Sequence, residues 1–175
     1  KISYDAPLTE EMELLAKTIE KEADWKISVS DRDKANGIGN AFDKNVNSYW
    51  HTSYTVTDGK ITDQVKPPYF ITVEFPEVKT ISGFNYLPRQ DANSAGVLLG
   101  YRIHASLDGE NFEEIFDGTF SYGSGHTDKK QKSASWGNTE MKAIKIEFTS
   151  TVANFGSAAE ISFLHDTKRD KKVFN

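Results

Sequence analysis

The sequence predicts an all-β domain, an antiparallel sandwich or barrel, on three observations. Short segments alternate apolar and polar residues, as strands with one buried face do. Turn residues such as Asp, Gly, Asn and Pro separate these segments. Aromatic residues make up 12% of the 175 residues, with 11 Phe and 7 Tyr, and such a content favours strands. Many short strands divided by turns are typical of sandwiches and barrels.

Residues 8–24, which read LTEEMELLAKTIEKEAD, depart from this pattern because their apolar residues recur at helical spacing. Thr9 is a candidate N-cap, and acidic residues follow it in the first turn, where the helix dipole favours them. The apolar stripe consists of Leu8, Met12, Leu15 and Ile19. We therefore expect residues 1–24 to form a short N-terminal helix or linker, whose stripe docks on the domain that follows.

After this helix, four segments follow the strand pattern most clearly. They are residues 69–75, 101–107, 143–150 and 158–164. The pair Asp108-Gly109 comes directly after the second segment and predicts a hairpin turn. We expect one domain over residues 25–164 and a charged, solvated tail over residues 165–175.

Composition narrows the classes of function. The formal net charge of −5 argues against a nucleic-acid-binding surface and against attraction to anionic lipid. The chain has no cysteine, which excludes disulfides, thiolate metal sites and a Cys nucleophile. No apolar run approaches the ~20 residues of a membrane-spanning helix. Because no nucleophile–base pair, phosphate loop or zinc motif is visible, we expect a domain that is not an enzyme, with a carboxylate pair for glycoside hydrolysis as the open alternative.

The run AFDKNVNSYWHT gathers oxygen-bearing side chains in a short space. Asp43, Asn45 and Asn47 stand at alternate positions, as at the start of an EF-hand loop. The sixth position is Ser48, where an EF-hand needs Gly for its sharp turn, and the twelfth is Tyr54, where it needs a bidentate Glu. An ion at this run would therefore need a different scaffold, and the alternative is that these side chains only cap a turn.

Five segments occur in the order typical of discoidin domains, also called coagulation factor V/VIII type C domains. They read AFDKNVNSYWHT, PPYFITVEF, ISGFNYLPRQD, GYRIHASLDGENF and AAEISF. The chain resembles in particular the bacterial branch, the family 32 carbohydrate-binding modules, and the N-terminal domain of galactose oxidase. Animal members usually tie their termini with a disulfide, so the absence of cysteine favours the bacterial branch. The resemblance implies a jelly-roll β-sandwich of about eight strands, with binding loops at one end.

The resemblance also implies a structural calcium ion, held between the loop after the first strand and the last strand. Carried over to this chain, the ligands are Asn40, Asp43, Asn45, Ser48, Ala159 and Glu160. Asp43 and Glu160 would supply carboxylates, Ser48 its hydroxyl and carbonyl, and the other three their backbone carbonyls. Calcium prefers about six to eight hard oxygen ligands, which this set provides. Glu160 supports the assignment, because an acid within the apolar segment AAEISF is costly to bury unless it is paired or metal-bound.

A sugar site is the third implication of the resemblance. In family 32 modules, the His of a WHT segment and the Arg of an LPRQ segment commonly bind sugar hydroxyls, and an aromatic ring covers the C–H face. The corresponding binding residues here are His51, Tyr54, Arg89, Asn93 and Phe155. Trp50 is expected to belong to the core. The implied ligand is a terminal galactose- or N-acetylhexosamine-type sugar.

Two departures from the family pattern leave the identity of the sugar undecided. Ala95 stands where the family usually has a polar residue before its Gly, with Asn93 as a possible substitute, and the loop after His51 is longer than usual. The alternative is that His51 and Arg89 are structural, with Arg89 paired to a nearby carboxylate such as Asp91. The alternative function is a discoidin-type protein- or lipid-interaction domain without sugar binding, in which the segments GVLLGY and FSYG would form apolar spikes.

The expected partner is thus a glycan or terminal sugar, and neither nucleic acid nor a membrane is expected. We expect the domain to be a monomer that belongs to a larger multidomain protein. Its expected location is outside the cell, at the cell surface or in the periplasm.

Overall fold

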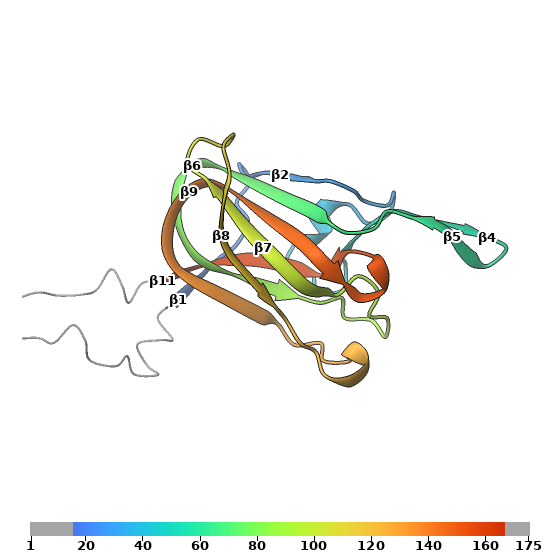
Figure 1. Ribbon diagram of the computed structural model, residues 1–175. Coiled ribbons are helices and arrows are strands. Elements are labelled where there is room, and N and C mark those ends of the chain that lie inside the picture. The colour runs from blue at the N-terminus through green and yellow to red at the C-terminus, as the bar shows by residue number, and fades with distance from the viewer. Residues whose placement is uncertain (1–15, 167–175) are drawn as a thin grey trace, which may run out of the picture.

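The computed structural model describes residues 16–166, which form a β-sandwich (Figure 1). The strands are β1 (Ala16–Ile19), β2 (Lys26–Val29), β3 (Trp50–His51), β4 (Tyr54–Thr57), β5 (Lys60–Gln64), β6 (Tyr69–Leu87), β7 (Leu98–Ser106), β8 (Glu113–Thr119), β9 (Lys132–Thr151), β10 (Ser157–Ala158) and β11 (Glu160–Asp166). Within the same range the loops contain the 3-10 helices η1 (Ile38–Ala41), η2 (Ser124–His126) and η3 (Val152–Asn154). The predicted all-β jelly roll is confirmed. No helix of the described range is long and apolar enough to cross a membrane.

The strands β6 and β9 pair along most of their length and turn a corner halfway, so that the sheet folds over into two layers (Figure 1). The register breaks at this corner, between Glu74 and Lys79. One layer contains β2, the first half of β6, the second half of β9, β7 and β8. The other contains β1, β11 and the remaining halves of β6 and β9. We call the side with the bends the corner end, and the side where β6 and β9 begin and finish the loop end.

Strand alternation fills the space between the layers. In β6, Ile71, Val73 and Phe75 are buried, while the residues between them are partly exposed. At the loop end, Trp50 is fully buried and its ring lies edge-on to Phe148, with 5.4 Å between the centroids. Trp50 is therefore a core residue, as predicted.

The predicted N-terminal helix is wrong for the part of it that the structure describes, because residues 16–19 form β1. This strand pairs antiparallel with β11, with Ala16 opposite Asp166, and Ile19 packs against the core. Residues 8–15, with the rest of the stripe, lie outside the described residues. Helical propensity is weak, and pairing prevails here because β11 would otherwise present an open edge.

The sheet therefore extends beyond the expected domain of residues 25–164 on both sides. β1 precedes it, and β11 continues through His165 and Asp166. The rest of the predicted charged tail, residues 167–175, lies outside the described residues.

Candidate functional site

His51 is positioned at the loop end by a short strand pair. β3 pairs with β10, with His51 opposite Ser157. On its other side, the backbone N–H of His51 donates to the carbonyl of Asn36 at 3.1 Å, and the N–H of Asp33 donates to the carbonyl of His51 at 2.9 Å. The backbone of His51 is thus fixed from both sides.

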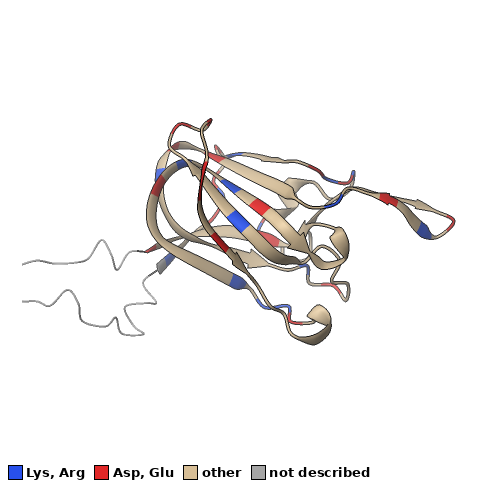
Figure 2. Ribbon diagram, in the orientation of Figure 1, with Lys and Arg blue, Asp and Glu red and all other residues tan. Residues whose placement is uncertain are grey.

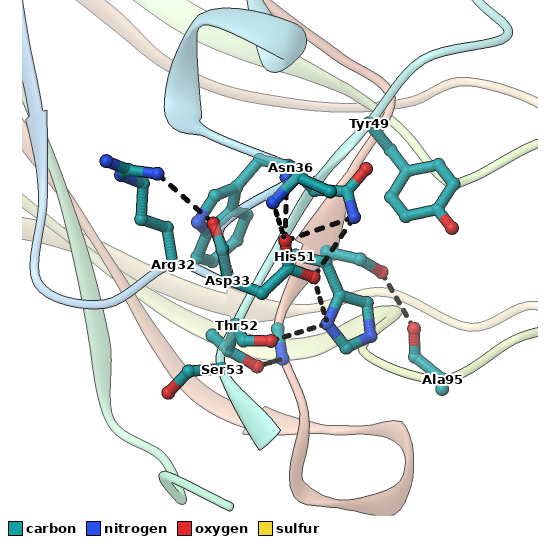
Figure 3. A network of polar contacts seen from close by, with 12 residues as sticks. Arg32, Asp33, Asn36, Tyr49, His51, Thr52, Ser53 and Ala95 are labelled. Atoms are coloured by element: carbon teal, nitrogen blue, oxygen red, sulfur yellow. Dashed lines mark hydrogen bonds and ion pairs between the residues drawn. The ribbon is translucent and has the colours of Figure 1, made fainter. Parts of the chain in front are cut away.

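The neighbours of the His51 imidazole determine its tautomer. Nδ1 lies 2.7 Å from the carbonyl oxygen of Thr52 and 3.9 Å from Oδ2 of Asp33 (Figure 3). Both oxygens accept hydrogen bonds, so Nδ1 carries the proton and Nε2 is left as an acceptor. An Nε2 lone pair held in this way is suited to a hydroxyl donor.

The electrostatic surroundings keep this imidazole neutral. Burial lowers the pKa of His51, and the positive charge of Arg89 lowers it further, while the Thr52 carbonyl, Asp33 and Asp91 act in the opposite direction. Since the ordinary pKa of His is about 6.5, His51 is uncharged at neutral pH.

Aromatic rings gather around His51. The centroid of its ring lies 5.4 Å from that of Tyr54 and 5.4 Å from that of Phe155, and the latter two are 5.8 Å apart. Phe155 is only 6% exposed, whereas Tyr54 is 46% exposed. The structure thus brings together three of the predicted sugar residues, and Tyr54 offers the accessible face while Phe155 supports it from within.

Arg89 is mainly engaged with protein groups. Its Nε and Nη2 donate to the two carboxylate oxygens of Asp91 at 2.8 and 2.7 Å, and Nη2 also donates to the Tyr49 hydroxyl at 2.9 Å. Nη1 donates to the carbonyl of Ala95 at 3.3 Å, and the guanidinium lies 4.2 Å from the centre of the Tyr49 ring. The bond to Arg89 holds the pKa of Asp91 below its usual range. One of the five guanidinium N–H groups is left without a partner among residues 16–166.

Asn93 shapes the loop that follows Arg89. Its side-chain oxygen accepts a hydrogen bond from the N–H of Ala95 at 2.8 Å, and its carbonyl accepts one from Nζ of Lys129 at 3.1 Å. The described contacts therefore tie Asn93 to its own loop and to Lys129 rather than to the ring cluster around His51.

Two residues of this site, Asp33 and Tyr49, were not found from the sequence. Asp33 accepts hydrogen bonds from the N–H groups of Ala35 and Asn36 at 2.8 and 2.6 Å, which aims its carboxylate toward His51. The polar segment SDRDKANG marks a turn in the sequence, but it does not show which strand the turn faces. Tyr49 directly precedes the core Trp50, and its place in the sequence does not show that its side chain contacts Arg89.

A second cluster at the loop end contains oxygen atoms. The Ser48 hydroxyl donates to Oδ2 of Asp43 and lies 3.1 Å from the carbonyl of Asn45 and 3.5 Å from that of Asn40. The N–H of Asn45 lies 2.9 Å from Oδ1 of Asp43 and 3.0 Å from Oε1 of Glu160. Five of the six residues predicted to hold calcium thus meet, and the sixth, Ala159, precedes Glu160 in the chain.

The two carboxylates of this oxygen cluster repel each other. Burial raises the pKa of Glu160 to about 8, and the neighbouring Asp43 adds to the shift. No lysine or arginine within residues 16–166 forms an ion pair with either carboxylate, and no group of three or more His, Cys, Asp or Glu side chains in that range could hold a metal. Two carboxylates with a hydroxyl and neutral carbonyls nevertheless form a donor set that fits a hard cation such as calcium.

Comparison with known families gives a match over most of the described chain. The model of the F5/8 type C domain family matches residues 26–161. Among curated proteins, galactose oxidase from Gibberella zeae is 28% identical over 88 residues, which are 50% of this chain and 12% of the oxidase. The chain thus spans only a small part of the length of this relative.

Solved structures show the same architecture. The family 32 module of NanJ from C. perfringens, in complex with galactose, has a TM-score of 0.71 at 21% identity, covering 86% of this chain and all 100% of that one. The module CpGH89CBM32-5 from Clostridium perfringens, in complex with GalNAc-beta-1,3-galactose, has a TM-score of 0.67 at 26% identity, covering 79% of this chain and 94% of that one.

Proposed function

The chain belongs to the F5/8 type C domain family, and from this premise we propose that it is a non-catalytic carbohydrate-binding module for a terminal galactose- or N-acetylhexosamine-type sugar. The observation that carries the proposal is the pairing of a fixed Nε2 acceptor on His51 with the exposed ring of Tyr54. The complexes of similar modules with galactose and with GalNAc-beta-1,3-galactose support the class of ligand.

In this proposal each group has a defined task. The Tyr54 ring covers the C–H face of the sugar, and Nε2 of His51 accepts a hydrogen bond from a hydroxyl. The remaining N–H of Arg89 donates to a second oxygen, while its bonds to Asp91 and Tyr49 hold it in place. Such a site makes few contacts, so we expect a dissociation constant near the millimolar range, which corresponds to a binding free energy of about −4 kcal/mol.

We further propose that the oxygen cluster around Ser48 binds a structural calcium ion. The ligands would be Asp43, Glu160, Ser48 and the carbonyls of Asn40, Asn45 and Ala159. The ion would neutralise the two carboxylates and join the loop after β2 to the start of β11. It takes no part in sugar chemistry in this proposal.

The lipid-binding alternative is disfavoured by the burial of its expected spikes. In GVLLGY, Val97 and Leu98 are buried, and in FSYG, Tyr122 is buried while Phe120 packs against the core. These segments therefore offer little apolar surface to a membrane. A glycan partner favours a location outside the cell, and the much greater length of galactose oxidase favours a place within a larger protein.

The test is a titration of the isolated chain with a panel of sugars, followed by NMR. Tyr54→Ala removes the platform, and His51→Asn keeps a donor for the Thr52 carbonyl but removes the Nε2 acceptor. Losing one such hydrogen bond costs ~1–3 kcal/mol, which abolishes detectable binding at millimolar affinity. Leu107→Ala, 65% exposed at the corner end, is the control and should bind as the wild type does.

If no sugar perturbs signals near His51 and Tyr54, the chain is better described as a discoidin-type interaction domain. Unchanged affinity in both variants would place the sugar elsewhere on the molecule.

A further inference from the structure

The hairpin β4–β5 projects from the loop end as a separate two-stranded arm (Figure 1). Asp58 and Gly59 form its tight turn, both with positive φ, of 52° and 75°. β4 and β5 form a sheet of their own and pair with each other. The arm is therefore open to solvent along much of its length.

One face of this arm is apolar. Tyr54 and Val56 lie two residues apart on β4, and Ile61 of β5 stands opposite Val56, beyond a shift of the register between Thr55 and Val56. The three side chains are 46%, 54% and 49% exposed. On the other face, the hydroxyls of Thr57 and Thr62 share a hydrogen bond of 3.1 Å. Val56 and Ile61 form a cross-strand pair, and we call these two residues together with Tyr54 the arm face.

The arm face continues directly from the candidate sugar site. Tyr54 belongs to both, because its ring contacts His51 and Phe155. At the base of the arm, Nε2 of Gln64 donates to the carbonyls of Ala153 and Asn154 at 3.1 and 2.7 Å. These two residues directly precede Phe155, so the two hydrogen bonds fix the base of the arm to the loop that carries Phe155.

The tip of the arm is polar. It reads Thr57-Asp58-Gly59-Lys60, and charged residues colour its outer end in Figure 2. An arm that inserts into a membrane would carry its apolar side chains at the tip, whereas here they lie along the side that adjoins the site. The arrangement fits a ligand that extends from the site along the arm.

We propose that the arm face is a second saccharide subsite, which contacts the sugar next to the terminal one through Val56 and Ile61. This inference rests on the proposed function, and it makes an oligosaccharide rather than a single sugar the preferred ligand. The apolar C–H surface of the second ring packs on the arm face, as that of the first packs on Tyr54. Burial of this surface supplies the added affinity.

The experiment compares galactose and N-acetylgalactosamine with disaccharides that end in each of them, by calorimetry on the full chain. The wild type should bind the better disaccharide roughly tenfold more tightly than its monosaccharide, which corresponds to about 1.4 kcal/mol. Val56→Thr/Ile61→Thr keeps β-branched residues in both strands but removes the apolar contact. It should lose the tenfold gain and leave monosaccharide affinity unchanged.

The control Val78→Thr/Leu107→Thr changes two exposed apolar residues at the corner end and should leave both affinities unchanged. Monosaccharide binding with no gain for any disaccharide would overturn the subsite alone. Absence of binding to every sugar would overturn both the subsite and the proposed function. Binding of the wild type to anionic vesicles, lost in the Val56→Thr/Ile61→Thr variant, would show a membrane arm instead.

Discussion

At the scale of single residues, His51 should make the proposed sugar binding depend on pH. Its pKa is lowered chiefly by burial and also by the charge of Arg89, so the folded protein disfavours the protonated imidazole. Nδ1 already carries a proton, and a second one would turn Nε2 from an acceptor into a donor. Affinity should therefore stay constant above pH 6.5 and fall as the pH drops through the lowered pKa of His51.

The stability of the folded protein should also decrease as the pH falls. The unfolded chain takes up the proton near pH 6.5 and the folded chain only at lower pH, so the contribution of His51 to stability is lost as the pH falls through this window. NMR titration of the imidazole and calorimetry at several pH values measure both effects, and His51→Asn, which cannot titrate there, is the control for the effect on stability. A pKa of His51 above 6.5, or tighter binding in acid, would contradict this account.

Gly156 allows its own backbone to lie close to Trp50, Tyr69 and Thr52 beneath the site. A Cβ at this position would lie 2.8 Å from ring carbons of both Trp50 and Tyr69 and 3.0 Å from Thr52. Gly156→Ala should therefore destabilise the protein by about 1–3 kcal/mol through overpacking. The control is Gly39→Ala, whose new Cβ would meet nothing within 4 Å. Equal melting temperatures for the two variants would show that the core adjusts without cost.

How far the site could be predicted also varies from residue to residue. His51, Tyr54 and Phe155 were expected together and lie together, since the family pattern fixes their order in the chain. Two other contacts, between Asp33 and His51 and between Arg89 and the Tyr49 ring, depend on which loops meet in space. A single sequence carries no signal for such contacts between distant segments.

At the scale of elements, the loop that carries Asp43 should depend on the proposed calcium ion. Saturating a site at ~100 times its dissociation constant adds about 2.7 kcal/mol. At roughly 2–4 °C per kcal/mol for a chain of this size, chelator should lower the melting temperature by several degrees. Differential scanning calorimetry with and without chelator measures the shift, and elemental analysis identifies the ion.

Asp43→Asn should remove this response to chelator. Because Asn has the same shape as Asp and keeps one acceptor oxygen for the bonds from Ser48 and the N–H of Asn45, the variant should melt close to the wild type once chelator is present. Glu77→Ala, which changes an exposed acid in the bend of β6, should respond to chelator as the wild type does. A melting curve of the wild type that chelator leaves unmoved, with no metal detected, would rule the ion out.

β1 gives a second test at this scale. The strand has four residues, and its backbone pairs with β11 while Ile19 packs on the core. At ~1 kcal/mol net for a backbone hydrogen bond, a chain that begins at Glu20 should be less stable by about 1–3 kcal/mol than one that begins at Ala16. Urea denaturation measures the difference, and identical midpoints would show that β1 adds nothing.

At the scale of the whole molecule, the fold was predictable because its signals are local. Alternation in each strand, turn residues between strands and the order of five segments all agree with one jelly roll. The failure lies at β1, where a helical spacing of apolar residues gave way to pairing with β11. That pairing joins residues almost the whole length of the chain apart, and local periodicity contains no information about it.

The same strand pair determines how the domain responds to mechanical force. Lys17 stands opposite His165, so tension applied through these two residues loads the ladder of hydrogen bonds from one end and opens it bond by bond, as a zipper. Tension through Glu20 and His165 would pull along the strands and load all the bonds together. Because the chain has no native cysteine, handles at either pair can be attached through introduced ones. Single-molecule pulling should show β1 yielding at lower force for Lys17→Cys/His165→Cys than for Glu20→Cys/His165→Cys, so the resistance of β1 to force depends on the direction in which the domain is loaded.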